Sequence, residues 1–250
     1  MNYKRLVCIG LDKCGTSWLY KSLITQNAIH DGGIKELGLY YKSEHLPVID
    51  NQIIIDIEHN YFKSTEALNR IKNDANSLVV LMLRNPKDRA EAHFNEFLKR
   101  GDKLSDLYCD KNISEVLQHS DYQNIVNTCK DLFKDRLHIV FFDDIENDPE
   151  GTISKVCCKL GVSFVSNKDI FKRYNIRRSA RNRYIGFIYK YLGQILRFAK
   201  LEKLLQFLRL NPFVVSLGYT KKIVELPRFP EELTVTLEKS SIFYKQLKDN

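Results

Sequence analysis

Residues 3–17 read YKRLVCIGLDKCGTS, and this stretch decides the fold class. Residues 3–9 are mostly apolar and β-branched, which is typical of a buried strand. Residues 10–17 follow with the spacing GxxxxGx(S/T), and a helical pattern runs over residues 16–25. A strand, a tight glycine loop and a helix N-terminus in this order indicate a phosphate-binding loop (P-loop), because backbone N–H groups and the helix dipole converge there on an anion.

One position separates this loop from that of nucleoside-triphosphate enzymes. Those enzymes have a lysine directly after the second glycine, where its ammonium reaches the β- and γ-phosphates. Here that position is Thr16, and a lysine stands instead at Lys13, two residues before Gly15. The sequence therefore predicts a loop that holds a phosphate without the usual triphosphate contact.

Apolar runs and helical patterns alternate beyond the loop. The expected strands are residues 52–57, 77–83 and 137–142, and the expected helices are residues 64–72, 86–99 and 149–160. Asn85 and Asp148 precede helices with proline in the first turn and can cap them, and Gly161 can end the last helix. This alternation predicts an α/β fold of three layers, with helices on both faces of a central parallel sheet and a helical C-terminal portion.

Composition and charge narrow the class of protein. The 250 residues are 44% hydrophobic, with 13 Tyr and 14 Phe, which excludes a disordered chain. We expect a single domain over residues 1–250, with its core at about 1–165 and a basic loop and helical cover at about 166–250. The net charge of +8 favours anionic partners. No nucleic-acid-binding module is recognised, so we expect no nucleic-acid partner.

Cysteine usage and the N-terminus predict the compartment. The six cysteines have neither a CxxC pair nor the spacing of a metal site, which indicates reduced thiols. Residues 1–10 lack the apolar region of a signal peptide, and no run of 18 uncharged apolar residues occurs. A cytoplasmic protein is therefore expected.

Two further segments contain charged residues that are candidates for a binding site. Residues 83–89 (LRNPKDR) place Arg84 at the C-terminal end of a predicted strand, where parallel sheets bind ligands and where an arginine suits a bidentate phosphate contact. The alternative is that Arg84 simply ends the strand. Residues 33–37 contain the adjacent pair Lys35 and Glu36, which spacing alone leaves as an ordinary surface pair.

Together these segments resemble the sulfotransferases that use 3′-phosphoadenosine 5′-phosphosulfate (PAPS). Residues 9–23 (IGLDKCGTSWLYKSL) are similar to their 5′-phosphosulfate loop, and residues 83–94 (LRNPKDRAEAHF) to their 3′-phosphate segment. Residues 34–41 (IKELGLYY) are similar to the Lys-Glu segment of the glycan and bacterial branch. Residues 56–61 and 141–162 match weaker family patterns, so the resemblance covers most of residues 4–162.

The resemblance implies roles for these residues. Lys13 would stabilise charge on the leaving phosphate, Arg84 would bind the 3′-phosphate, and Glu36 would act as general base with Lys35 beside it. No metal would be needed, and the product nucleotide would be adenosine 3′,5′-bisphosphate. The loop that would hold the 5′-phosphosulfate consists of Lys13, Cys14, Gly15, Thr16, Ser17 and Trp18.

Three positions depart from the family pattern. Ala92 stands where a serine usually provides the second 3′-phosphate ligand, with His93 after it as a possible substitute. Gly38 stands where a histidine commonly follows the Lys-Glu pair, and Trp18 stands where a smaller residue is frequent.

The C-terminal third is basic and helical in pattern. Arg178 and Arg183 lie in a dense basic run, in a region that in the family tends to close over the donor. A helix after it carries Ile185, Ile188, Leu192, Ile195 and Leu196 on one side. We expect a core-packed cover or a homodimer contact in preference to a helix that lies on an anionic membrane.

The leading hypothesis is a PAPS-dependent sulfotransferase whose acceptor is a hydroxyl, expected to belong to a saccharide or glycoconjugate. A P-loop kinase or NTPase is the alternative enzyme, because residues 53–58 and 139–144 read as strands that end in an acid able to hold Mg²⁺. Thr16 argues against it. A third hypothesis is a non-catalytic nucleotide-binding relative, motivated by Ala92 and Gly38.

Overall fold

The computed structural model describes residues 3–30, 35–42, 46–172, 179–180, 183–198, 201, 208, 219–220 and 225–249 of the chain. They belong to two units, each with its own core. The sheet unit comprises Met1–Asn85, Asp121–Asn175 and Ile242–Asn250, and the helical unit comprises Pro86–Ser120 and Ile176–Ser241. The predicted P-loop lies wholly in the sheet unit.

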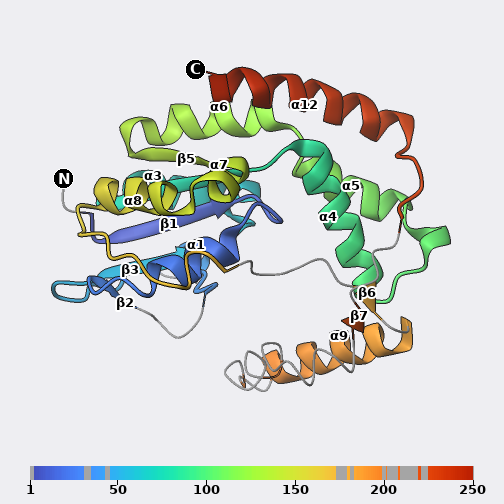
Figure 1. Cartoon of the computed structure of the whole chain (residues 1–250), viewed down its shortest axis with the longest axis horizontal. Helices are drawn as coiled ribbons and strands as arrows, with labels where there is room; N and C mark the ends of the chain where they lie inside the picture. Colours follow the sequence, from blue (N-terminus) through green and yellow to red (C-terminus); the bar gives the residue numbers. More distant parts are fainter. Residues whose placement is uncertain are drawn as a thin grey trace. The chain divides into compact units, whose positions relative to one another are not determined.

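Five parallel strands form the sheet, in the spatial order β2-β3-β1-β4-β5 (Figure 1). Every residue of β1, β3 and β4 is buried. Because such strands are covered on both faces, they appear in the sequence as nearly continuous apolar runs. The predicted central parallel sheet is confirmed. Its strands are β1 (Arg5–Gly10), β2 (Ile29–His30), β3 (Ile53–Ile57), β4 (Ser77–Leu83) and β5 (Leu137–Phe141).

Helices cover both faces of this sheet. After α1 the chain moves to the β2–β3 side of β1, whereas after α3 it crosses to β4 on the other side. Since crossovers between parallel strands are right-handed, this reversal puts α1 and α3 on opposite faces. Helix α8 packs against α1, and α6 packs against α3, which gives the three predicted layers. The helices of this unit include α1 (Thr16–Leu23), α2 (Leu39–Lys42), α3 (Thr65–Asn73), α6 (Tyr122–Phe133), α7 (Phe142–Asn147) and α8 (Pro149–Leu160).

The ends of α8 follow the local chemistry of the sequence. Asp148 Oδ1 accepts a hydrogen bond of 2.9 Å from the backbone N–H of Gly151, which caps the first turn. Gly161 ends the helix with φ 76°, a left-handed conformation that favours glycine. Both predicted boundaries are therefore confirmed, whereas the short β2 and the helices α5 (Asp110–Gln118) and α6 were not predicted.

The helical unit has a smaller apolar core. Its helices α4 (Pro86–Lys99) and α5 contribute to this core together with residues 231–241 of α12 (Glu231–Asp249). Helix α9 (Arg183–Phe198) contacts α4 and the two-stranded sheet of β6 (Ser179–Ala180) and β7 (Tyr219–Thr220). The buried core residues are Ala90, Phe94, Phe97, Leu107, Val116, Leu233 and Leu237. Within the described residues, no helix has the length and apolarity required to cross a bilayer.

Candidate functional site

The P-loop connects the C-terminal end of β1 to α1. Lys13 (φ 59°) and Gly15 (φ 95°) both adopt left-handed conformations, which curl the backbone in the way that gathers N–H groups around an anion. Gly15 is the N-cap residue of α1, so the N-cap position itself has no side chain that could cap this helix end. A Cβ at Gly15 would lie 3.1 Å from both Ile145 Cδ1 and Phe142 Cδ2, so the loop leaves no room for a side chain there.

Arg84 follows β4, the strand next to β1, and its guanidinium contacts the P-loop. Nη1 of Arg84 donates a hydrogen bond of 3.3 Å to the carbonyl oxygen of Lys13, and the guanidinium carbon lies 4.3 Å from the ring centre of Phe142. The Tyr122 hydroxyl donates to the Arg84 carbonyl at 2.7 Å and fixes the backbone. Nε of Arg84 is buried and has no hydrogen-bond partner among the described residues. Arg84 therefore contacts the loop, and its Nε–H group still has no acceptor among the described residues.

Lys35 and Glu36 reach the same loop from a different segment. Nζ of Lys35 lies 3.1 Å from Thr16 Oγ1 and 3.4 Å from Glu36 Oε1. The side chain of Lys35 is 22% exposed, whereas that of Glu36 is 47% exposed. The pair that spacing alone left as ordinary surface thus joins the P-loop to a solvent-accessible carboxylate.

Asp56, a buried residue of β3, holds this segment in place. Its carboxylate accepts hydrogen bonds from the backbone N–H groups of Leu37, Gly38 and Leu39, at 3.1, 3.2 and 2.9 Å, and from the Tyr61 hydroxyl. Burial raises the pKa of Asp56, although these hydrogen bonds act in the opposite direction. The carbonyl of Lys35 also accepts a hydrogen bond of 3.1 Å from the backbone N–H of Ile57, so the segment is attached to β3 at several points.

Gly38 has a local structural reason to be glycine. Its φ of 64° lies in the left-handed region that favours this residue. The turn lets three successive N–H groups point to Asp56, which accounts for the departure from the histidine that the family commonly has here.

His59 is a candidate functional residue that the sequence reasoning missed. Its Nδ1 lies 3.9 Å from Glu36 Oε1 and 3.8 Å from Glu58 Oε1. His59 lies in the turn that follows β3, and β3 lies next to β1 in the sheet. Position after a buried strand is the sequence signal that could have identified it, since ligands bind at this edge of parallel sheets.

Other predicted site residues lie elsewhere or have other contacts. The Cys14 side chain is buried, and the Trp18 indole is buried and donates to the Ile170 carbonyl at 2.7 Å, so neither side chain is open to a ligand. Ala92 belongs to α4 in the helical unit, where Nε2 of the adjacent His93 lies 3.2 Å from Glu115. Arg178 and the side chain of Arg183 lie outside the described residues.

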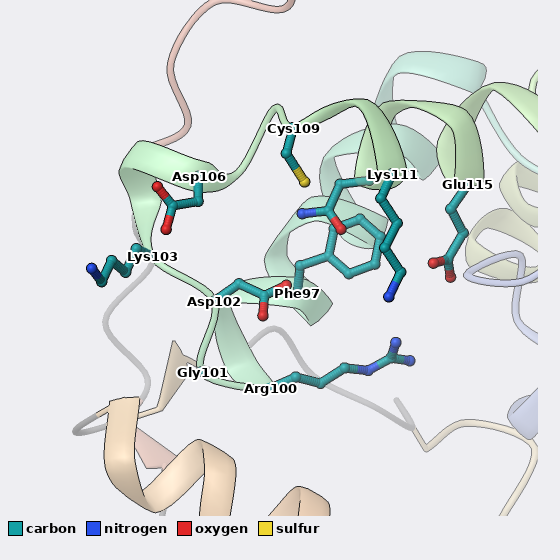
Figure 2. A pocket seen from close by; sticks show the side chains of 10 residues that line it. Phe97, Arg100, Gly101, Asp102, Lys103, Asp106, Cys109, Lys111 and Glu115 are labelled. Carbon is teal, nitrogen blue, oxygen red and sulfur yellow. The ribbon is translucent and has the colours of Figure 1, made fainter.

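A pocket of about 320 Å³ lies in the helical unit (Figure 2). Arg100, Asp102, Lys111 and Glu115 are among its lining residues, so charges of both signs line it. Of the predicted site residues that the structure describes, none lines this pocket. The described residues contain no group of three or more His, Cys, Asp or Glu side chains placed to hold a metal ion.

The geometry in the sheet unit can bind an anion and move a proton. The loop supplies backbone N–H groups, Lys35 and Arg84 supply positive charge beside it, and Glu36 supplies an exposed carboxylate. Such a combination suits transfer of an anionic group to an acceptor that must lose a proton.

Comparison with known proteins gives a family and a fold. The model described as "Sulfotransferase family" matches residues 38–166, which is about half of the chain. The matched segment begins after the P-loop and the Lys35–Glu36 pair. No curated protein matches the chain.

Three solved structures share the fold. A sulfotransferase from Alicyclobacillus acidocaldarius is 17% identical, with a TM-score of 0.57 over 82% of this chain and 96% of that one. The sulfotransferase domain of the Synechococcus PCC 7002 olefin synthase is 15% identical, with a TM-score of 0.54 over 97% and 95%. The sulfotransferase domain of the curacin biosynthetic pathway is 16% identical, with a TM-score of 0.51 over 70% and 78%.

Proposed function

The chain belongs to the sulfotransferase family, and we propose that it transfers a sulfuryl group from PAPS to a hydroxyl of a saccharide or glycoconjugate, with Glu36 as general base. One observation carries the proposal: the Lys35 ammonium contacts both Thr16 of the P-loop and Glu36. This contact joins the predicted donor loop to the predicted base.

Donor binding is assigned to the residues around the P-loop. The backbone around Gly15, with Thr16 and Ser17, would hold the 5′-phosphosulfate, because the N-terminus of α1 begins at a glycine and favours an anion. Arg84 would bind the 3′-phosphate, and its buried Nε without a partner among the described residues supports that role. Lys13 and Lys35 would stabilise the charge that develops on the leaving phosphate.

The reaction would proceed by an in-line displacement at sulfur. A bond forms between the acceptor oxygen and sulfur while the bond between sulfur and the leaving phosphate oxygen breaks, with adenosine 3′,5′-bisphosphate as the product. Glu36 takes the proton of the acceptor hydroxyl. Its partial exposure suits an acceptor that enters from solvent, and His59 at 3.9 Å is placed to orient its carboxylate.

The acids that motivated the kinase alternative have other partners. Asp56 accepts hydrogen bonds from three backbone N–H groups and Tyr61, and Glu58 accepts one of 3.0 Å from the backbone N–H of Asn60. Asp143 and Asp144 lie 2.9 and 3.7 Å from the Lys248 ammonium. These four carboxylates therefore have structural partners within the sheet unit. We also propose a cytoplasmic location, in keeping with six cysteines that are all free thiols.

Ligand-dependent thermal stability tests the donor assignment. Adenosine 3′,5′-bisphosphate at 100 times its Kd should stabilise the protein by about 2.7 kcal/mol, and ATP with Mg²⁺, ADP and AMP should have smaller effects. Arg84→Ala should reduce the shift, whereas Arg100→Ala, an exposed arginine of the helical unit that pairs with Glu96, should not. A shift with ATP and Mg²⁺ alone would instead support the kinase.

Transfer of radiolabelled sulfate from PAPS to saccharide and non-saccharide hydroxyl acceptors tests the reaction. Product formation that Glu36→Gln abolishes, with bisphosphate binding intact, is the expected result. Bisphosphate binding without transfer to any acceptor would support the non-catalytic relative.

A further inference from the structure

Helix α9 presents an apolar face to solvent. Six large side chains on it are exposed, by 41% to 93%, and they recur at helical spacing: Tyr184, Ile188, Tyr191, Leu192, Ile195 and Phe198. Gly193 and Leu196, which point to another side of the helix, are buried. This differs from the core-packed cover expected from the sequence, because Ile188, Leu192 and Ile195 are exposed. An exposed apolar stripe of this length indicates an interaction surface.

The sequence of α9 repeats every seven residues. Residues 183–188 read RYIGFI and residues 190–195 read KYLGQI, and Arg197-Phe198 begins a third copy. The repeat puts an aromatic residue at 184, 191 and 198, on the exposed stripe, and a basic residue directly before each one. Helix α9 contains no acidic residue. Aromatic residues beside basic ones are characteristic of helices that lie at a membrane–water interface.

Positive charge is concentrated around this helix in the sequence. Residues 172–224 contain thirteen Lys and Arg but a single Glu, a net charge of +12. The other 197 residues contain 26 Lys and Arg and 30 Asp and Glu, a net charge of −4. The basic character of the chain therefore belongs to the segment that carries the exposed stripe.

We propose that the apolar face of α9 binds the surface of an anionic lipid bilayer. The helix would lie in the plane of the interface, with the exposed Tyr, Ile and Phe side chains at the boundary between headgroups and acyl chains and the basic residues among the anionic headgroups. A second copy of this chain fits less well, because it would bring two segments of +12 together while α9 offers no acid to offset them. An anionic membrane provides both the apolar and the negative surface.

Vesicle sedimentation with the full chain tests this proposal. We expect binding to vesicles of phosphatidylcholine with phosphatidylserine, little binding to phosphatidylcholine alone, and release between about 0.05 and 0.5 M salt. The double variant Ile188→Asp/Ile195→Asp should bind more than tenfold more weakly. Since both side chains are 62% exposed, its melting temperature should match that of the wild type. Ile242→Asp, 60% exposed on α12, is the matched control and should bind as the wild type does.

Three results would overturn the proposal. The first is no binding to anionic vesicles at low salt. The second is equal binding by the wild type and Ile188→Asp/Ile195→Asp, which would mean that charge alone attracts the chain. The third is a dimer, seen by size-exclusion chromatography with light scattering, that the double variant makes monomeric, which would assign the stripe to a second copy.

Discussion

The side-chain ammonium of Lys35 donates a hydrogen bond of 3.1 Å to the hydroxyl of Thr16. The P-loop has no lysine directly after its second glycine, and Lys35 brings an ammonium to that position from another segment of the sheet unit. Its reach depends on Asp56, which holds the following residues by their backbone N–H groups. The P-loop, the ammonium of Lys35 and the carboxylate of Glu36 are therefore brought together by tertiary contacts between separate segments.

Loss of the Lys35 ammonium should impair transfer strongly. Lys35→Met keeps the length of the side chain but removes the charge, so we expect kcat to fall about 100-fold or more, as when one preorganised donor is removed from an active site. Initial rates with PAPS and an acceptor measure this. Lys63→Met, a lysine after β3 that lies over the Phe62 ring, is the control and should retain activity. A Lys35→Met enzyme with wild-type kcat would exclude a catalytic role.

Gly15→Ala tests whether ligand binding depends on the shape of the loop and not only on the stability of the fold. The left-handed φ of 95° and the close approach of Ile145 and Phe142 predict a loss of about 1–3 kcal/mol in the free energy of unfolding. The displaced loop should also lose binding of adenosine 3′,5′-bisphosphate. Gly161→Ala, with φ 76° at the end of α8, should cost comparable stability but retain binding. Equal loss of binding in both variants would contradict a specific role for the loop.

Asp56 should matter both for stability and for catalysis. Asp56→Ala leaves three backbone N–H groups and the Tyr61 hydroxyl without their acceptor, so we expect a loss of about 2–4 kcal/mol in urea unfolding. Tyr61→Phe removes the hydrogen bond to Asp56 and the one of 3.0 Å that the hydroxyl accepts from the backbone N–H of Tyr40, and it should cost about 1–2 kcal/mol. At a temperature where Asp56→Ala is folded, its kcat should also fall, because the segment of Lys35 and Glu36 is released. Full activity of the folded variant would show that Asp56 is dispensable for placing Glu36.

Acid should weaken the fold through His138. Burial, together with Lys159 and Lys155, lowers the pKa of His138 from 6.5 to about 4. Between these two pH values the unfolded chain takes up a proton that the folded chain does not, so the free energy of unfolding decreases as pH falls through this window. Urea unfolding at a series of pH values should show a smaller decrease for His138→Gln than for the wild type. A parallel decrease in both proteins would contradict this assignment.

Much of the fold could be predicted from the sequence, because its buried strands are nearly continuous apolar runs. β4 and α8 have the predicted bounds because local signals mark them. β4 is a continuous apolar run, and α8 begins with a proline and ends at a glycine. β2 has two residues and leaves no pattern to detect. α6 was missed although Tyr122, Ile125, Val126, Cys129 and Phe133 recur at helical spacing, because polar residues separate them.

The candidate site was predictable only in its local parts. The P-loop is one continuous segment, so its spacing was visible in the sequence. The contact between Lys35 and Thr16, and that between His59 and Glu36, depend on β3 lying next to β1, which no local pattern encodes. In the sequence, Gly38 departs from the family motif. In the structure it forms a turn with positive φ, and its backbone N–H donates to Asp56.

His59 should act through Glu36 as a positioning residue. The carboxylate of Glu36 is about half exposed, so its orientation depends on its neighbours Lys35 and His59, and His59→Gln removes the second of these. We expect kcat to fall about tenfold, with little change in the KM for PAPS, because the donor loop is untouched. His30→Gln, a histidine of β2 whose partner is Gln52, is the matched control and should leave both constants unchanged. Steady-state kinetics with PAPS and a saturating acceptor measures the two constants. If His59→Gln instead raised the KM for PAPS at constant kcat, His59 would belong to the donor site and the base would be oriented by Lys35 alone.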